Sequence, residues 1–186
     1  EKVTRGLTAA AYSLLQDVFA YPVINSSVFF LDDFPSPVPM GNGEYIRKYF
    51  GRDISSFYSN IWWPDMLKIA EKHGVRYTGV VIEDYSERTS GTFPRTTDTE
   101  RFRYFGGLLL EKGGEIGIHG YNHMPLCPDG FDFLGKVDYE TWPTANDMRS
   151  AIAELMDFTK TLFPKNTIST YVPPSNILSA EGRAML

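Results

Sequence analysis

The feature that most restricts the fold is an alternation of short apolar runs with segments of helical periodicity. The apolar runs lie at residues 27–33, 75–84, 115–120 and 167–172. The segments with helical spacing and capping signals lie at 63–74, 99–112 and 144–164. Since two parallel strands need a long crossover, usually a helix, this order predicts an α/β fold with a parallel sheet and right-handed crossovers. A barrel and an open doubly wound sheet both satisfy it.

The remaining segments define the expected domain organisation. Residues 4–20 have helical spacing and are assigned to an N-terminal helical extension, residues 1–26, ahead of one α/β domain at residues 27–186. Residues 34–61 are rich in Pro, Gly, Ser and Asn, which predicts mainly loop. The last residues resemble a helix at its first turn, with Ser179 as its cap, so we expect a segment of a longer protein.

Charge and apolar content exclude several classes of partner. The formal net charge is −5, and no segment gathers Lys and Arg, so we expect neither nucleic acid nor an anionic membrane as a partner. No run reaches the roughly 18–20 consecutive apolar residues that a membrane span needs, so no transmembrane segment is predicted. The single Cys127 excludes an internal disulfide and is interpreted as a packing residue.

Polar residues close the predicted strands, and this places the candidate site. In parallel α/β folds, sites lie at the carboxyl ends of the strands. The residues at these ends are Asp32-Asp33, Glu83-Asp84, His119 with His123 just beyond, and Pro173-Pro174-Ser175. Carboxylates and imidazoles should therefore meet at one face of the sheet.

The two histidines have a spacing that suits a shared metal ion. In a helical turn His119 and His123 would lie on one side, and Gly120 allows a bend directly after the strand. Two imidazoles and one carboxylate leave coordination positions open, as in hydrolytic zinc and mononuclear iron sites. Either Asp32 or Asp33 could supply the carboxylate. Because adjacent strand residues point to opposite faces, both can serve one site only if the chain twists or ends there, with the second acting as a base.

Three stretches resemble motifs of the polysaccharide deacetylase family, the NodB-homology domain. "FFLDDFPSP" resembles its first motif, "HGYNH" its second, and "YVPPSN" partially resembles its third, in matching order across about residues 27–176. The resemblance implies part of a distorted (β/α) barrel. It also implies hydrolytic removal of acetyl groups from a carbohydrate, with a divalent metal, most often zinc.

The resemblance also assigns roles to individual residues. It makes Asp32 the general base and Asp33, His119 and His123 the metal ligands. The residues expected to line the substrate site are Tyr121, Pro173, Pro174 and Ser175. An acetylated oligosaccharide or polysaccharide would be the partner, and an extracellular or cell-envelope location is implied.

Two departures from the family pattern keep other functions open. The Arg of the third motif falls at Val172 and its aromatic residue at Ser175, and no His follows His123 to act as general acid. Four strands are also fewer than the family's about seven or eight, which a truncated chain or a divergent member with another acid would explain. The alternatives are an inactive carbohydrate-binding or scaffold domain, and an iron oxygenase with the same ligands, for which the sequence suggests no co-substrate site.

Other polar and aromatic residues have structural interpretations. Trp62 and Trp63 are expected to pack at a helix entry rather than to stack on a sugar. His73 is expected to complement a helix C-terminus. Glu83 and Asp84 are expected to be solvated loop carboxylates, with a position facing the site as the alternative.

Overall fold

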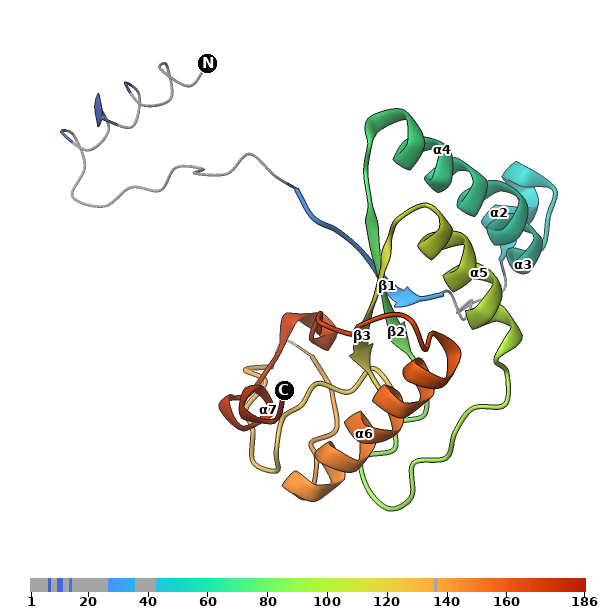
Figure 1. Ribbon diagram of the computed structural model, residues 1–186. Helices are drawn as coiled ribbons and strands as arrows, with labels where there is room; N and C mark the ends of the chain where they lie inside the picture. Colours follow the sequence, from blue (N-terminus) through green and yellow to red (C-terminus); the bar gives the residue numbers. More distant parts are fainter. Residues whose placement is uncertain (1–6, 8–9, 12–13, 15–26, 36–42, 136) are drawn as a thin grey trace.

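A computed structural model of the chain describes residues 27–35, 43–135 and 137–186, and residues 7, 10, 11 and 14 (Figure 1). The helix predicted at 4–20 therefore lies largely outside the described residues. Among the described residues, no helix is both long enough and apolar enough to cross a membrane.

A parallel sheet forms the centre of the fold, as predicted. Its strands are β1 (Phe29–Phe34), β2 (Tyr77–Ile82) and β3 (Glu115–Gly120), in the order β1-β2-β3. The predicted fourth strand is only an extended segment beside β3. It pairs through one parallel bridge between Ile118 and Tyr171 and through two flanking backbone hydrogen bonds. The α/β class with parallel strands and helical crossovers is thus confirmed.

The three predicted helices are present close to their predicted bounds. They are α4 (Trp63–His73), α5 (Glu100–Glu111) and α6 (Ala145–Leu162). Helix α5 contacts β2 and β3, and α6 contacts β3 (Figure 1). Thr144 and Asp147 have the spacing of a capping box in the sequence, and the Thr144 side chain accepts a hydrogen bond from the backbone N–H of Asp147 at 3.1 Å, which confirms this cap of α6.

The C-terminal helix also begins where the sequence indicates. Helix α7 (Ala180–Met185) is capped by Ser179, whose hydroxyl accepts from the N–H of Gly182 at 2.8 Å. The same hydroxyl donates to the carbonyl of Leu126 at 2.7 Å, so the cap also ties α7 to the loop that follows β3.

The prediction of a loop over residues 34–61 is wrong from residue 44 onward. That region forms α2 (Glu44–Phe50), α3 (Ile54–Phe57) and a π-helical turn, η1 (Tyr58–Trp62), which runs directly into α4. Asp53 caps α3 by accepting from the N–H of Ser56 at 2.8 Å. Aromatic rings at 50, 57, 58 and 62 contact one another in sequence. These packing contacts outweigh the loop-like composition.

The unbroken apolar run at residues 27–33 predicts a strand covered on both faces, but β1 is not covered in this way. Phe29 and Phe30 are 46% and 45% exposed, whereas every residue of β2 is buried. The difference follows from sheet order, because β2 lies between two strands and β1 pairs only with β2 among the described residues.

The carboxyl end of β1 is nevertheless anchored in the core. Phe34 is buried and lies edge-on to Trp63, which stacks on Phe105 with centroids 5.2 Å apart. A Cβ at Gly79 would lie 2.5 Å from the Phe34 ring, so the ring lies directly on β2. This packing confirms the structural interpretation of Trp63 and holds the chain directly after the Asp32-Asp33 pair.

Candidate metal centre

An irregularity in β1 changes the course of the chain at the two aspartates. Leu31 pairs with Gly79 and Phe34 with Val81, so β1 holds one residue more than β2 across this interval. Asp33 has φ 55°, in the left-handed region. Such a bulge bends a strand and redirects its side chains. It is the change of course that the sequence required if both aspartates serve one site.

A second bulge lies on the other side of β2. Val81 pairs with Ile118 and Ile82 with Gly120, so His119 is the extra residue of β3. Gly120 follows with φ 125°, a conformation that L side chains rarely adopt. The two bulges lie at the same end of the sheet and present Asp33 and His119 there.

His123 reaches the site by a route that differs from the prediction. The expected helical turn is absent, since residues 121–123 form bends and His123 has φ 60°. The carbonyl of Tyr121 accepts from the backbone N–H groups of Glu83 at 3.1 Å and Asp84 at 2.9 Å. These bonds fix the loop against the end of β2, and the loop then returns the second imidazole to the first.

The three predicted ligands converge. Oδ1 of Asp33 lies 3.6 Å from Nε2 of His119 and 3.6 Å from Nε2 of His123. All three ligand atoms lie within 4.8 Å of one another. His119 is buried, while the side chains of Asp33 and His123 are partly exposed, which leaves one side of the cluster open to solvent.

Hydrogen bonding around the cluster fixes the orientation of one imidazole. Nδ1 of His119 lies 2.7 Å from the carbonyl oxygen of Val172, which can only accept, so Nδ1 carries the proton. In the neutral ring, Nε2 then directs a lone pair at Asp33. Oδ1 of Asp33 is a buried atom with no hydrogen-bond partner among the described residues.

A divalent cation fits this arrangement. A lone pair and a carboxylate oxygen face each other with no donor between them, which leaves a buried acceptor unsatisfied. One carboxylate and two imidazoles form a donor set that zinc accepts, with positions left open for water or substrate. A metal ligand that bonds a carbonyl through its other ring nitrogen is typical of zinc sites.

The electrostatic environment favours a neutral His123. Burial lowers the pKa of His123 from its usual value, and the negative charges of Asp33 and Asp32 only partly oppose this effect. A neutral imidazole is the form that binds a metal. Asp32 is exposed and directly precedes Asp33 in the chain.

The residues expected to line the substrate site differ in accessibility. Tyr121 is 1% exposed, and its hydroxyl donates to the carbonyl of Pro94 at 2.6 Å. Pro174 is buried and Pro173 half-buried, while Ser175 is exposed with φ 50°. Ser175 and Pro173 therefore lie where a ligand could contact them, whereas Tyr121 holds a loop.

The interpretation of Glu83 and Asp84 as solvated carboxylates is wrong for Glu83. Glu83 is 4% exposed, and its Oε1 accepts from the N–H of Thr96 at 3.1 Å. Burial raises its pKa to about 7. Asp84 accepts from the N–H and hydroxyl of Ser86. Both residues hold the loop after β2 because its backbone offers donors close to the strand end.

Two tyrosines near the cluster were not identified from the sequence. The hydroxyl of Tyr139 lies 3.2 Å from Nδ1 of His123, and that of Tyr85 lies 3.5 Å from the carbonyl of Asp33. Both come from irregular segments where no periodicity marks a residue. For Tyr139, the signal in the sequence is the aromatic-rich composition of residues 131–142.

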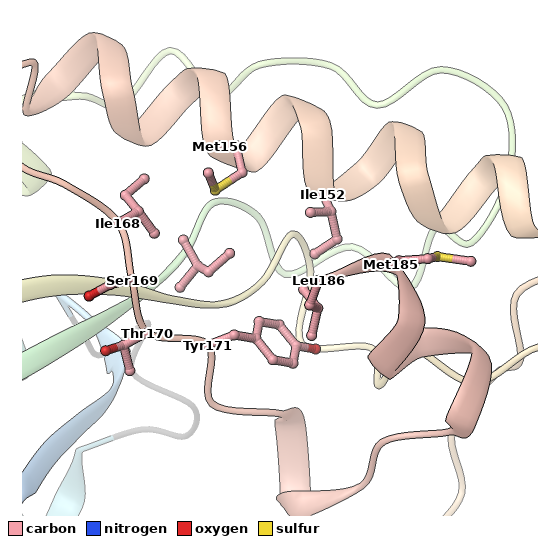
Figure 2. A pocket seen from close by; sticks show the side chains of 9 residues that line it. Ile152, Met156, Ile168, Ser169, Thr170, Tyr171, Met185 and Leu186 are labelled. Carbon is pink, nitrogen blue, oxygen red and sulfur yellow. The ribbon is translucent and has the colours of Figure 1, made fainter.

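A cavity of about 390 Å³ lies elsewhere, between α6, the segment beside β3 and the C-terminal residues (Figure 2). Its lining is mostly apolar and includes Ile152, Met156 and Leu186. None of the three candidate ligands lines it, so its size does not make it the reactive centre.

Comparisons with solved structures give remote similarities. Over 67% of its length the chain is similar to a CE4 family pseudoenzyme from Bacillus anthracis, with 15% identity and a TM-score of 0.46. A mutant of that pseudoenzyme with restored enzymatic activity gives the same identity, coverage and TM-score. The matched region spans 34% of the wild-type pseudoenzyme and 35% of the mutant, so the chain corresponds to about a third of their length. No curated protein matches the chain.

A sequence-family comparison covers every residue. The family model described as "Uncharacterised protein conserved in bacteria (DUF2194)" matches residues 1–186. The chain therefore belongs to the DUF2194 family of bacterial proteins.

Proposed function

We propose that this chain carries the metal site of a hydrolase that removes acetyl groups from a carbohydrate. The observation that supports the proposal is the meeting of Asp33 Oδ1 with Nε2 of His119 and His123, three ligand atoms within 4.8 Å of one another. The motif resemblance of "FFLDD" and "HGYNH" supplies the reaction class.

Each residue has a separate role in the proposed reaction. Asp33, His119 and His123 hold the cation, which would polarise the acetyl carbonyl and activate water when bound. Asp32, exposed beside the cluster, accepts the proton of the attacking water. Ser175 and Pro173 lie at the exposed rim, where they would contact the sugar. None of these residues is assigned as general acid.

A second candidate is an inactive carbohydrate-binding or scaffold domain with the same fold. One observation favours it. Asp32 has no hydrogen-bond or ion-pair partner among the described residues, and Val172 stands where the resembled family has the Arg that braces the base. An unbraced carboxylate is poorly oriented for proton transfer.

Acetate release by the full-length protein from acetylated sugar oligomers separates the two candidates. The hydrolase should release acetate when supplied with zinc, and chelation should stop it. Asp32→Asn should retain bound zinc and lose acetate release. His123→Ala should bind zinc only weakly and below stoichiometry, should release no acetate and should keep the fold. A zinc-loaded wild-type protein that releases no acetate would leave the binding or scaffold function. Stoichiometric zinc in His123→Ala would contradict the ligand assignment.

A further inference from the structure

Tyr139 links the candidate metal ligand His123 to Ser175, which follows the extended segment beside β3. Its hydroxyl oxygen lies 3.2 Å from Nδ1 of His123 and 2.7 Å from Oγ of Ser175. Its ring contacts the His123 ring, with centroids 5.9 Å apart, and the Phe133 ring at 6.1 Å. The side chain is half-buried, so part of its surroundings is protein and part is solvent.

The two ends of the segment that carries Tyr139 are paired with each other. Pro128 and Trp142 form a parallel bridge, and the N–H of Asp129 donates to the carbonyl of Trp142 at 2.9 Å. The indole N–H of buried Trp142 donates to the carbonyl of Pro125 at 2.8 Å. The segment thus starts and ends at one anchored point directly after the histidine motif.

The backbone at Ser175, the hydrogen-bond partner of Tyr139, is also held in place. Ser175 follows buried Pro174 and has φ 50°, which places it at a sharp turn of the chain. The N–H of Asn176 donates to the carbonyl of Pro173 at 2.9 Å and closes that turn. The Ser175 segment therefore meets the Tyr139 segment at the Tyr139 hydroxyl, which lies beside Nδ1 of His123.

Metal binding by His123 would decide which atom donates in the hydrogen bond between His123 and Tyr139. If Nε2 of His123 binds the cation, the proton of the neutral ring must lie on Nδ1. Nδ1–H then donates to the Tyr139 oxygen, and the Tyr139 hydroxyl donates to Oγ of Ser175. This is the role that the carbonyl of Val172 has for His119. One ligand is braced by the backbone and the other by a phenol.

We propose that Tyr139 is a positioning residue that holds His123 in the Nδ1–H form and in the orientation that binds the metal. Ser175 completes the arrangement by accepting from the Tyr139 hydroxyl. The inference rests on the proposed function for its metal, but the effect on the imidazole concerns the metal-free protein as well.

Zinc affinity tests the role through variants that differ by one hydroxyl. Tyr139→Phe keeps the ring and removes the acceptor, so zinc affinity should fall by roughly 10–100-fold, as for other outer partners of metal ligands. Ser175→Ala should cause a smaller loss, because the Tyr139 oxygen remains. Tyr104→Phe, at a 61% exposed tyrosine on α5, is the matched control and should bind zinc as the wild type does.

A double-mutant cycle separates action through His123 from a general loosening of the site. In a His123→Ala background, Tyr139→Phe should weaken the residual zinc binding no further, because its target is gone. An equal fold-loss in both backgrounds, or wild-type affinity in Tyr139→Phe alone, would overturn the inference and leave the proposed function intact.

Nitrogen NMR of the metal-free protein gives a readout that needs no zinc. At alkaline pH the ring shifts of His123 should indicate Nδ1–H in the wild type and should move toward Nε2–H in Tyr139→Phe. Those of His119 should stay unchanged. Absence of zinc binding in the wild type would refute the proposed function, and unchanged His123 shifts in Tyr139→Phe would refute the role of Tyr139.

Discussion

At the scale of single residues, unusual backbone conformations position side chains of the candidate site. Asp33, His123 and Ser175 all have φ between 50° and 60°, although none is glycine. Left-handed conformations cost such residues about 1–3 kcal/mol each and cluster at functional sites. Here all three surround one group of ligand atoms, so the local strain coincides with the candidate site.

Asp33→Asn should separate the charge of this residue from its conformation. Asparagine tolerates the left-handed region and keeps an acceptor oxygen, so the metal-free protein should be no less stable in urea denaturation. Zinc affinity by calorimetric titration should fall by more than the roughly 10–100-fold expected for an outer partner. Asp33→Ala should in addition lose about 1 kcal/mol of stability, because alanine lacks that tolerance. Wild-type zinc affinity in Asp33→Asn would remove this residue from the ligand set.

Glu83 should make stability depend on pH. Its pKa is raised by burial from 4.5 to about 7, so the folded state binds more protons than the unfolded state between these values. The stability that the folded protein gains by binding this proton is complete below about pH 4.5 and is lost as the pH rises through 7. Glutamine stays neutral at every pH, so the unfolding free energy of Glu83→Gln should rise by about 3 kcal/mol relative to that of the wild type between pH 4.5 and 7. Urea denaturation at several pH values measures the difference.

The matched control for this experiment is Glu71→Gln, which alters an exposed carboxylate on α4. Its stability should run parallel to that of the wild type across the same pH range. Parallel curves for Glu83→Gln as well would show that the buried carboxylate does not titrate in this range.

Regular elements could be predicted from the sequence because their signals are local. Helical periodicity and capping residues such as Thr144 and Ser179 gave the starts of α6 and α7. Unbroken apolar runs gave β2 and β3, and the residues that close the strands gave the candidate ligands. These features depend on neighbours along the chain, which the sequence displays directly.

Features that depend on distant partners could not be predicted. Each bulge exists only relative to the register of β2, and the exposure of Phe29 depends on which strand lies at the edge. The helices between residues 44 and 62 depend on contacts among rings. Tyr139 contacts His123 from a segment that is closed by the bridge between Pro128 and Trp142. None of these leaves a local pattern.

The adjacent glycines of α5 should respond oppositely to alanine. A Cβ at Gly106 would lie 2.3 Å from Cζ of Phe163, whereas a Cβ at Gly107 would meet nothing within 4 Å. Gly106→Ala should therefore lose about 1–3 kcal/mol of unfolding free energy through overpacking. Gly107→Ala should gain up to about 1 kcal/mol through helix propensity. Equal effects of the two in urea denaturation would contradict the packing of Phe163 on α5.

At the scale of the whole molecule, the candidate site joins segments far apart in the chain. Asp33 lies one residue before the end of β1, His119 one residue before the end of β3, and Val172 in the segment beside β3. Arg95 pairs with Glu154 and Asp157 and so ties the loop after β2 to α6, although such exposed pairs contribute little. A cation at the cluster would be the stronger cross-link, because it connects two strands and a loop.

Zinc should therefore stabilise the whole fold. At about 100 times its dissociation constant, zinc should raise the unfolding free energy by about 2.7 kcal/mol. Thermal denaturation with and without chelator measures the effect, and His123→Ala should show none of it. The result is expected for the hydrolase and for the inactive binding domain alike, so a zinc-insensitive melting temperature would count against zinc binding at this cluster.

The oxygen that orients His119 belongs to the main chain of Val172, and this has a consequence for how relatives are recognised. Evolution can exchange the side chain at that place without disturbing the imidazole, because every amino acid brings the same carbonyl. Genome searches that demand a basic residue there would discard sequences whose coordination sphere is intact.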